Sequence, residues 1–217
     1  VCSSTFILNQ ISDEKSDSIN QKLFLVGKFI TKEKSQSISK ILLITGILIL
    51  LIVNWFSAIL VCIIYLIWGI VYNRPPFSWK KKPLLGWFAN TIVGVLLFAT
   101  GWSLVMQNNP FPTIIPLEIS MLILLLPYGL CFSSVSLLTT LPDIKGDSSS
   151  GDKTFPIVFG KNTTLFIALI FIIFAFIIAL QNNDPLASTS TLVSIPFFIF
   201  AFIRRMDKDI LRAIRYP

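Results

Sequence analysis

The sequence predicts an all-α, polytopic transmembrane helical bundle, and three observations lead to that prediction. Of the 217 residues, 54% are hydrophobic and only 13% are charged, whereas about 25% are charged in an average soluble protein. The mean hydropathy is +0.78. The apolar residues form uninterrupted blocks, which excludes the alternating pattern of a membrane β-barrel. Helices are then the structures that satisfy the backbone hydrogen bonds of these blocks in lipid.

Apolar blocks define the expected membrane helices. Several are shorter than the roughly 20 residues that a perpendicular span needs, so we expect the helices to extend a few residues beyond them. The first block is short and resembles only the end of a span. Because the chain starts on Val and ends just after a basic segment, we expect a single transmembrane domain over residues 1–217, truncated at its N-terminus and open to a further span at its C-terminus. In order, the blocks are Val1–Leu8, Ile38–Val53, Phe56–Tyr72, Trp87–Val105, Ile114–Leu138, Thr164–Leu180 and Thr189–Ile203.

The basic residues predict how the bundle is oriented. All 18 Lys and Arg lie in four clusters that alternate with connectors free of them, which is the positive-inside pattern. The net charge of +7 therefore indicates topology and attraction to anionic membrane lipid, and no nucleic-acid-binding motif accompanies it. We expect an integral protein of a bacterial or archaeal inner membrane, with its basic face cytoplasmic. The clusters are Lys15–Lys40, Arg74–Lys82, Lys145–Lys161 and Arg204–Arg215, and the connectors without Lys or Arg lie around Asn54, Gln107–Thr113 and Gln181–Ser188.

Most acidic residues lie on the same face as the basic ones. Nine of the 11 do so, and the exceptions are Glu118 and Asp184. Directly after the first apolar block, Asn9, Asp13 and Asp17 follow one another in steps of four. Each such step rotates by only about 40° on a helix, so the three side chains are expected to share one helix face at the membrane boundary.

A second acidic cluster follows the apolar block that ends near Leu138. Asp143 and Asp147 repeat the four-residue step, and Asp152 adds a further carboxylate. Ionised carboxylates repel one another unless a cation neutralises them, and hard oxygen ligands suit Mg²⁺. The two clusters together therefore predict a Mg²⁺ site for a phosphate-bearing ligand whose tail lies in lipid. The alternative for each cluster is a set of helix caps and solvated loop residues.

A basic and aromatic segment, Tyr72–Pro83, lies on the same face. Its Pro75-Pro76 pair predicts a helix end and an extended turn. One interpretation is a positive-inside loop with an aromatic belt, and the other is a set of cations that bind a diphosphate and offset the charge of the leaving group. The cations are Arg74, Lys80, Lys81 and Lys82.

The residue inventory excludes some kinds of chemistry. The chain has no His, which rules out a histidine general base and a His-ligated zinc or haem site. No Ser or Cys therefore has a His to activate it as a nucleophile. Cys2, Cys62 and Cys131 lie in or beside apolar blocks without Cys-x-x-Cys spacing, and we interpret them as small buried hydrophobic residues.

These motifs, in this order, resemble those of the UbiA-type intramembrane aromatic prenyltransferases. The resemblance runs from Asn9 to about Gly160 and implies a ring of nine transmembrane helices around a central cavity. It further implies Mg²⁺-dependent transfer of an isoprenyl group from an allylic polyprenyl diphosphate to an electron-rich acceptor, an aromatic quinone precursor or a similar lipid precursor. The motifs that carry it are Asn9-x-x-x-Asp13-x-x-x-Asp17, the Tyr72-Asn-Arg-Pro-Pro loop, and Asp143-x-x-x-Asp147 with the trailing Gly151-Asp-Lys-Thr154.

The resemblance also implies roles for individual residues. The first motif would bind a Mg²⁺ that bridges the diphosphate, the second motif would serve a second Mg²⁺, and Tyr72 would lie at the active site. Basic residues after the tyrosine would contact the diphosphate. The implied metal ligands are Asn9, Asp13, Asp17, Asp143 and Asp147, the implied catalytic residues are those four Asp and Tyr72, and the implied diphosphate-binding residues are Asn9, Arg74, Lys80, Lys81 and Lys153.

Two residues depart from the family pattern. Gln10 follows Asn9 where many members have Asp, which resembles the branch that handles homogentisate or related acceptors more than the 4-hydroxybenzoate branch. Asn73 stands where Ser is more usual. The acceptor and the length of the isoprenoid stay open.

Two other classes of membrane protein are alternatives. A CDP-alcohol phosphotransferase-like enzyme would also depend on Asp and Mg²⁺, but its single long motif, with Asp-Gly and Ala-Arg followed by Gly and two Asp, is absent. A non-enzymatic transporter or lipid-binding protein would more naturally place ionisable residues near the middle of its spans. Here they gather at one interface, which favours phosphate chemistry.

Overall fold

The computed structural model describes residues 1–21, 25–106 and 119–215. In these ranges the chain is helical apart from connecting segments and one isolated bridge between Val26 and Ile30, so the expected all-α bundle is confirmed. The Gln107–Thr113 connector, the start of the Ile114–Leu138 block and Glu118 lie outside the described residues.

Five helices of the described ranges are long and apolar enough to cross a membrane. They correspond to five of the predicted blocks. The Phe56–Tyr72 block forms α3 (Trp55–Tyr65) and continues as the π-helix η1 (Leu66–Val71), which together make a shorter apolar helix that ends before Pro75-Pro76. The five long helices are α2 (Lys32–Val53), α4 (Pro83–Met106), α5 (Ile119–Thr139), α8 (Lys161–Gln181) and α9 (Pro185–Arg204).

The first apolar block and the first acidic motif form one continuous helix, α1 (Cys2–Ile19). It packs against α2 and η1, and also against the short helix α6 (Ile144–Ser149). Two buried hydroxyls join α1 to α2: the oxygens of Ser4 and Ser39 are 2.8 Å apart, and Ser39 Oγ is also 3.0 Å from the Ser4 carbonyl. The polar residues after Leu8 therefore continue a helix that is anchored by its first half.

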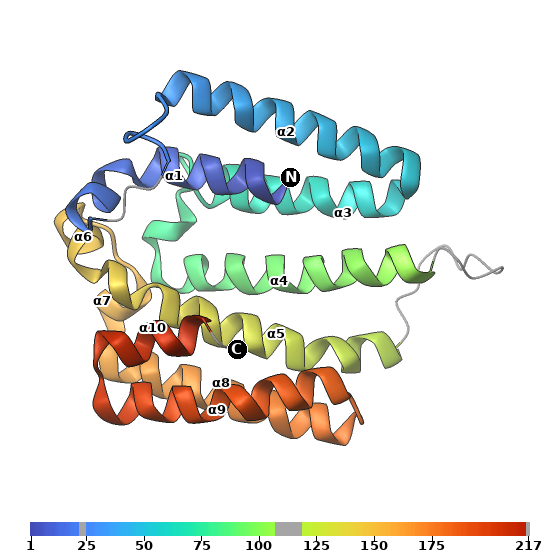
Figure 1. Cartoon of the computed structure of the whole chain (residues 1–217), viewed down its shortest axis with the longest axis vertical. Helices are drawn as coiled ribbons and strands as arrows, with labels where there is room; N and C mark the ends of the chain where they lie inside the picture. The colour runs from blue at the N-terminus through green and yellow to red at the C-terminus, as the bar shows by residue number, and fades with distance from the viewer. Residues whose placement is uncertain (22–24, 107–118, 216–217) are drawn as a thin grey trace.

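Helices that follow one another in the chain lie side by side, with contacts from α2 through α3, α4 and α5 to α8 and α9 (Figure 1). The larger buried core joins α5, α8, α9 and α10 (Asp207–Arg215), and Leu137, Ile172 and Phe198 lie in it. A smaller core around Ile64 and Val93 joins α3 to α4. The nine-helix ring that the family resemblance implies stays a prediction for this chain.

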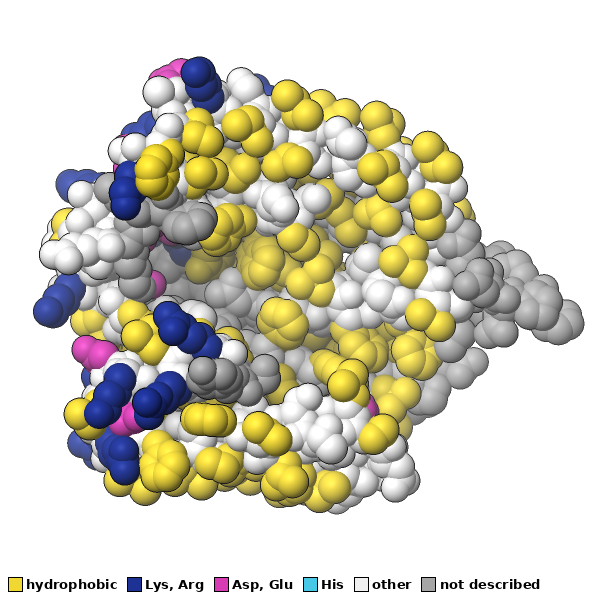
Figure 2. Space-filling model, viewed as in Figure 1, with side chains coloured by type: hydrophobic (Ala, Val, Ile, Leu, Met, Phe, Trp, Pro, Cys, Tyr) yellow, Lys and Arg dark blue, Asp and Glu magenta, His cyan; other side chains and the backbone are white. Residues whose placement is uncertain are grey.

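The charged side chains gather at one end of the helices, and apolar side chains cover most of the rest of the face shown in Figure 2. Such an apolar exterior suits hydrocarbon and not water; Ile52, for example, is 87% exposed. The chain is thus an integral membrane protein with one strongly charged face. Short elements build this end: α6, α10, η2 (Trp79–Lys81), η3 (Leu141–Asp143) and α7 (Phe155–Phe159).

Candidate active site

A polar cavity of about 230 Å³ opens at the charged end. Residues of α1 line one side of it, and residues of η3 and α6 line another. The structure therefore brings together two acidic motifs that lie far apart in the sequence. Among the residues proposed from the sequence, those that line the cavity are Asn9, Asp13, Asp17, Tyr72, Lys80, Lys82, Asp143, Asp147 and Asp152.

Three of the proposed diphosphate-binding residues do not line this cavity. Arg74 is exposed and lines a different cleft, which Leu8 and Lys40 also line. The ammonium of Lys81 lies 2.7 Å from Oδ1 of Asp152, and Asp152 does line the cavity. Lys153 is exposed, and its backbone N–H donates to the carbonyl of Lys81 at 3.1 Å.

The helical period of α1 explains the first half of the cavity. Because α1 runs unbroken to Ile19, the four-residue steps place Asn9, Asp13 and Asp17 along one helix face, and all three side chains line the cavity. Gln10 points elsewhere: its Oε1 accepts hydrogen bonds from the backbone N–H groups of Leu25 and Val26, both at 3.3 Å. In this structure Gln10 thus holds the backbone of Leu25 and Val26 against α1.

Asn20, which the motif analysis did not single out, joins the two acidic motifs. It directly follows α1, and its side-chain Nδ2 donates to Oδ1 of Asp143 at 3.3 Å and to the Asp143 carbonyl at 3.4 Å. Its Oδ1 accepts from the N–H of Gly146 at 2.9 Å. A Cβ on Gly146 would lie 2.4 Å from Asn20 Nδ2 and 2.6 Å from the carbonyl oxygen of Ser16, so only glycine allows this approach.

The segment after the proline pair contacts both motifs through adjacent lysines. Lys80 forms an ion pair with Asp13 of the first motif, and its ammonium also donates to the hydroxyl of Ser12 at 2.7 Å. Lys81 pairs with Asp152 beside the second motif. The Lys80 side chain is only 8% exposed, so this cation is held inside the site and not in solvent.

Like charges converge in the cavity. Asp147 interacts electrostatically with the carboxylates of Asp143, Asp13 and Asp152. Such repulsion is relieved when cations enter, and carboxylate and amide oxygens are ligands that suit Mg²⁺. The indole Nε1 of Trp87, which also lines the cavity, is buried and has no hydrogen-bond partner among the described residues. The donor set therefore fits a divalent cation together with a ligand that accepts hydrogen bonds.

The acidic side chains of the cavity do not by themselves form a complete metal-binding site. Among the described residues, no group of three acidic, His or Cys side chains is close enough to hold one ion by itself. Mg²⁺ commonly takes one or two carboxylates and completes its shell with phosphate oxygens and water. The arrangement fits ions shared with a phosphate-bearing ligand and does not fit a self-sufficient structural metal.

Tyr72 directly follows η1 and faces the same cavity. Burial raises the pKa of its phenol to about 12; the side-chain hydrogen bond to Asn90 opposes this rise, and the Asp13 carboxylate adds to it. The phenol is therefore neutral at physiological pH and can donate a hydrogen bond. Asn90 is a second residue that the motif analysis missed, because it lies within an apolar block.

The fold and the cavity define a class: a helical membrane protein with a carboxylate- and lysine-lined site at one membrane face. The chain belongs to the UbiA prenyltransferase family, whose family model matches residues 1–215. A curated relative is the 2-acyl-4-prenylphloroglucinol 6-prenyltransferase, chloroplastic, of Humulus lupulus, which is 27% identical over 184 residues. That alignment covers 80% of this chain and 43% of the relative, so the chain spans less than half of the relative's length. No solved structure matches the chain significantly. The resemblance noted from the motifs is thereby confirmed at the level of the family.

Proposed function

We propose that this protein transfers an isoprenyl group from an allylic polyprenyl diphosphate to an aromatic acceptor within the membrane. The observation that carries the proposal is the convergence of both acidic motifs and Lys80 on one cavity at the charged end of an apolar bundle. Family membership and the relative's name, which describes transfer of a prenyl group to a phloroglucinol, support this reaction class.

In the proposed site, Asn9, Asp13 and Asp17 would hold one Mg²⁺, and Asp143 and Asp147 would hold a second. When bound, the ions supply positive charge that stabilises the departing diphosphate. Lys80 lines the cavity and holds its ammonium beside Asp13 and Ser12, so in this proposal it is the cation that binds a diphosphate oxygen. Tyr72, as a neutral phenol, donates a hydrogen bond to the same group.

Bond making and bond breaking then follow from the shape of the site. The bond between C1 of the isoprenyl group and the diphosphate oxygen breaks, and the electron pair leaves with the diphosphate. The allylic cation is kept from water by the apolar cavities that adjoin the polar one. The electron-rich ring attacks C1 and then loses a ring proton, which the released diphosphate or water accepts. No covalent enzyme nucleophile takes part.

The proposal extends to orientation and to the acceptor. The basic connectors favour a cytoplasmic location for the charged face. A quinone precursor and an acylphloroglucinol-like phenol are both electron-rich rings that suit the reaction. That the membrane is a bacterial or archaeal inner membrane stays a prediction.

The test is an assay of the chain in lipid nanodiscs with geranylgeranyl diphosphate, Mg²⁺ and separate acceptors: homogentisate, 4-hydroxybenzoate and an acylphloroglucinol. A prenylated ring that forms with Mg²⁺ and disappears with EDTA is the expected product. Pyrophosphate release without any prenylated ring would overturn transfer to an aromatic acceptor. Turnover of a CDP-alcohol in parallel reactions would instead favour the phosphotransferase alternative.

A further inference from the structure

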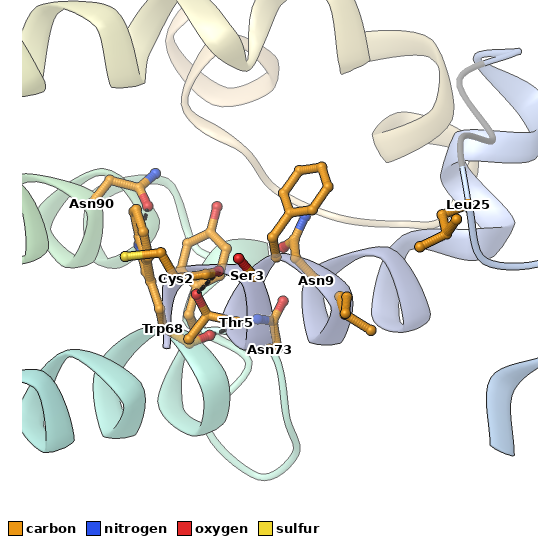
Figure 3. A pocket seen from close by; sticks show the side chains of 11 residues that line it. Cys2, Ser3, Thr5, Asn9, Leu25, Trp68, Asn73 and Asn90 are labelled. Atoms are coloured by element: carbon orange, nitrogen blue, oxygen red, sulfur yellow. Dashed lines mark hydrogen bonds between the residues drawn. The ribbon is translucent and has the colours of Figure 1, made fainter. Parts of the chain in front are cut away.

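Two apolar cavities adjoin the polar cavity. One, of about 690 Å³, lies beside α1 and η1 (Figure 3), and we name it the α1–η1 cavity. The other, of about 590 Å³, is lined mainly by α5 and α9, and we name it the α5–α9 cavity. Asn90 lines all three cavities, and Trp68 lines both apolar ones. The two apolar cavities therefore meet at this pair of side chains.

A hydrogen-bonded bridge runs through this meeting point. The indole Nε1 of Trp68 donates to Asn90 Oδ1 at 2.7 Å, and Asn90 Nδ2 donates to Ser136 Oγ at 3.1 Å. The three residues come from three elements, η1, α4 and α5. Each partner fixes one end of the Asn90 amide, so the amide and the indole ring are held as a wall between the cavities (Figure 3 shows the Trp68–Asn90 contact).

Each apolar cavity opens onto the polar one along its own edge. Asn9 and Tyr72 line both the polar cavity and the α1–η1 cavity. Ser136 and Thr139 line both the polar cavity and the α5–α9 cavity. A group bound in the polar cavity therefore has two separate apolar neighbours, one on each side of the bridge.

The chemistry of the two compartments differs. In the α5–α9 cavity, several wall hydroxyls are already bonded within their own helices: Thr139 Oγ1 donates to the Ser136 carbonyl at 2.9 Å, and Thr191 Oγ1 donates to the Ala187 carbonyl at 2.7 Å. What these groups present to the cavity is mostly hydrocarbon, which suits an isoprenyl chain.

Asn73 lines the α1–η1 cavity and also the cleft that contains Arg74. Asn73 is only 6% exposed, and its Nδ2 donates to the Trp68 carbonyl at 2.6 Å. Its Oδ1 is buried and has no hydrogen-bond partner within the described ranges. A buried carbonyl oxygen without a donor is costly, so a ligand hydroxyl that reaches it would be favoured.

We propose that the Trp68–Asn90–Ser136 bridge is a partition that assigns two ligands to two compartments. The isoprenyl chain lies in the α5–α9 cavity, and a hydroxylated aromatic ring lies in the α1–η1 cavity with a ring hydroxyl donating to Asn73 Oδ1. This inference rests on the proposed function, because it places the donor tail and the acceptor on opposite sides of the diphosphate.

A binding experiment without catalysis tests the partition. Phloroglucinol serves as the ring probe and geranylgeraniol as the chain probe, and calorimetry measures each on the chain in nanodiscs, with empty nanodiscs subtracted. For the wild-type chain, the affinity for phloroglucinol is expected to change less than about 2-fold when geranylgeraniol is saturating, since the two probes occupy different compartments. Mutual competition, or no phloroglucinol binding above empty nanodiscs, would overturn the inference.

Variants test the role of the bridge and the role of the Asn73 contact separately. Asn73→Leu removes the amide oxygen and is expected to weaken phloroglucinol binding about 3- to 10-fold, the worth of one hydrogen bond, and to leave geranylgeraniol binding unchanged. Trp68→Phe and Ser136→Ala each break the bridge, and with either variant the probes are expected to compete. Ser136→Ala, the smaller change, serves if Trp68→Phe fails to fold by circular dichroism.

The matched control is Trp55→Phe, a tryptophan that is 60% exposed on the apolar exterior and is expected to leave both affinities unchanged. An Asn73→Leu chain that binds phloroglucinol as tightly as the wild type would contradict the ring assignment. These probes carry no diphosphate, so their binding decides the partition even if no prenyl transfer occurs. Conversely, if the wild-type chain transfers a prenyl group but the two probes compete for binding, the partition is refuted and the proposed function is still supported.

Discussion

The first acidic motif lies on α1, a continuous helix of 18 residues, whereas the second lies where the short η3 gives way to the six-residue α6. In the first motif, the helix itself brings Asn9, Asp13 and Asp17 to one face. In the second motif, contacts with a neighbouring element fix the residues in place, because Asn20 at the end of α1 forms hydrogen bonds to Asp143 and Gly146. Local helical structure thus positions the side chains of the first motif, whereas tertiary contacts position those of the second motif.

The largest effect is expected from removing a carboxylate charge in either motif. Asp13→Asn and Asp143→Asn should each lower prenyl transfer by at least about 100-fold, since even partners outside the ligand shell of a metal are worth roughly 10- to 100-fold. Product formation at saturating Mg²⁺ measures the loss. Asp207→Asn, at a side chain that is 90% exposed, is the control and should retain activity. Full Mg²⁺-dependent turnover by both motif variants would refute the site assignment.

Gly146→Ala is expected to break the second motif and spare the first. The new Cβ would meet the Ser16 carbonyl at 2.6 Å, which is backbone and cannot rotate away, so α6 must shift from α1. Overpacking of this kind costs about 1–3 kcal/mol in the free energy of unfolding. Thermal unfolding in detergent together with the transfer rate reports both effects.

Gly101→Ala provides the matched comparison, because a Cβ at that position in α4 would have no atom within 4 Å apart from its chain neighbours and the backbone of its own helix. It should stabilise the helix by roughly 0.5–1 kcal/mol and leave transfer unchanged. Equal unfolding temperatures and transfer rates for the two alanine variants would show that the contact between α1 and α6 does not affect the site.

Asn20→Ala is expected to have a smaller effect, a loss of roughly 10-fold in transfer, because it removes the side chain that orients Asp143 but leaves all carboxylates in place. If Asn20 acts by positioning the second motif, the variant should need more Mg²⁺ for half-maximal rate. Asn182→Ala removes a similar amide contact, to the Ile123 carbonyl at 3.0 Å, at the opposite end of the bundle, and should change neither quantity. An Asn20→Ala chain with wild-type Mg²⁺ dependence would reduce Asn20 to a purely structural residue.

The same contrast explains what could be predicted from the sequence. Uninterrupted apolar blocks predict the membrane helices, and the helical period predicts that Asp13 and Asp17 share a face, since both depend on neighbours in the chain. Asn20 could not be predicted as the partner of Asp143, because the two are 123 residues apart and no motif connects them. Asn90 is hidden in an apolar block, and only its contacts across three helices reveal it.

Residues near a motif are also hard to place from sequence alone. Arg74 and Lys80 lie in one basic segment and were expected to act together, yet Lys80 enters the polar cavity and Arg74 lines a different cleft. The turn between them decides which side chain faces inward. The helix α10 was not predicted either: its buried Ile210 and Ala213 lie among charged residues, so no apolar block marks it.

The smallest expected effect concerns Tyr72, which follows η1 and faces both motifs. Its burial holds the pKa of the phenol at about 12, so the group stays protonated as the pH rises past the ordinary tyrosine value near 10. Tyr72→Phe removes one hydrogen bond and should lower the transfer rate about 3- to 10-fold. The ratio of the wild-type rate to the Tyr72→Phe rate should stay the same between about pH 7 and pH 10. Parallel pH profiles of transfer for the two chains check this. A wild-type rate that falls toward the Tyr72→Phe rate with a midpoint near pH 10 would mean that the phenol ionises as it does in water, and that the cavity between the two motifs is wetter than its burial indicates.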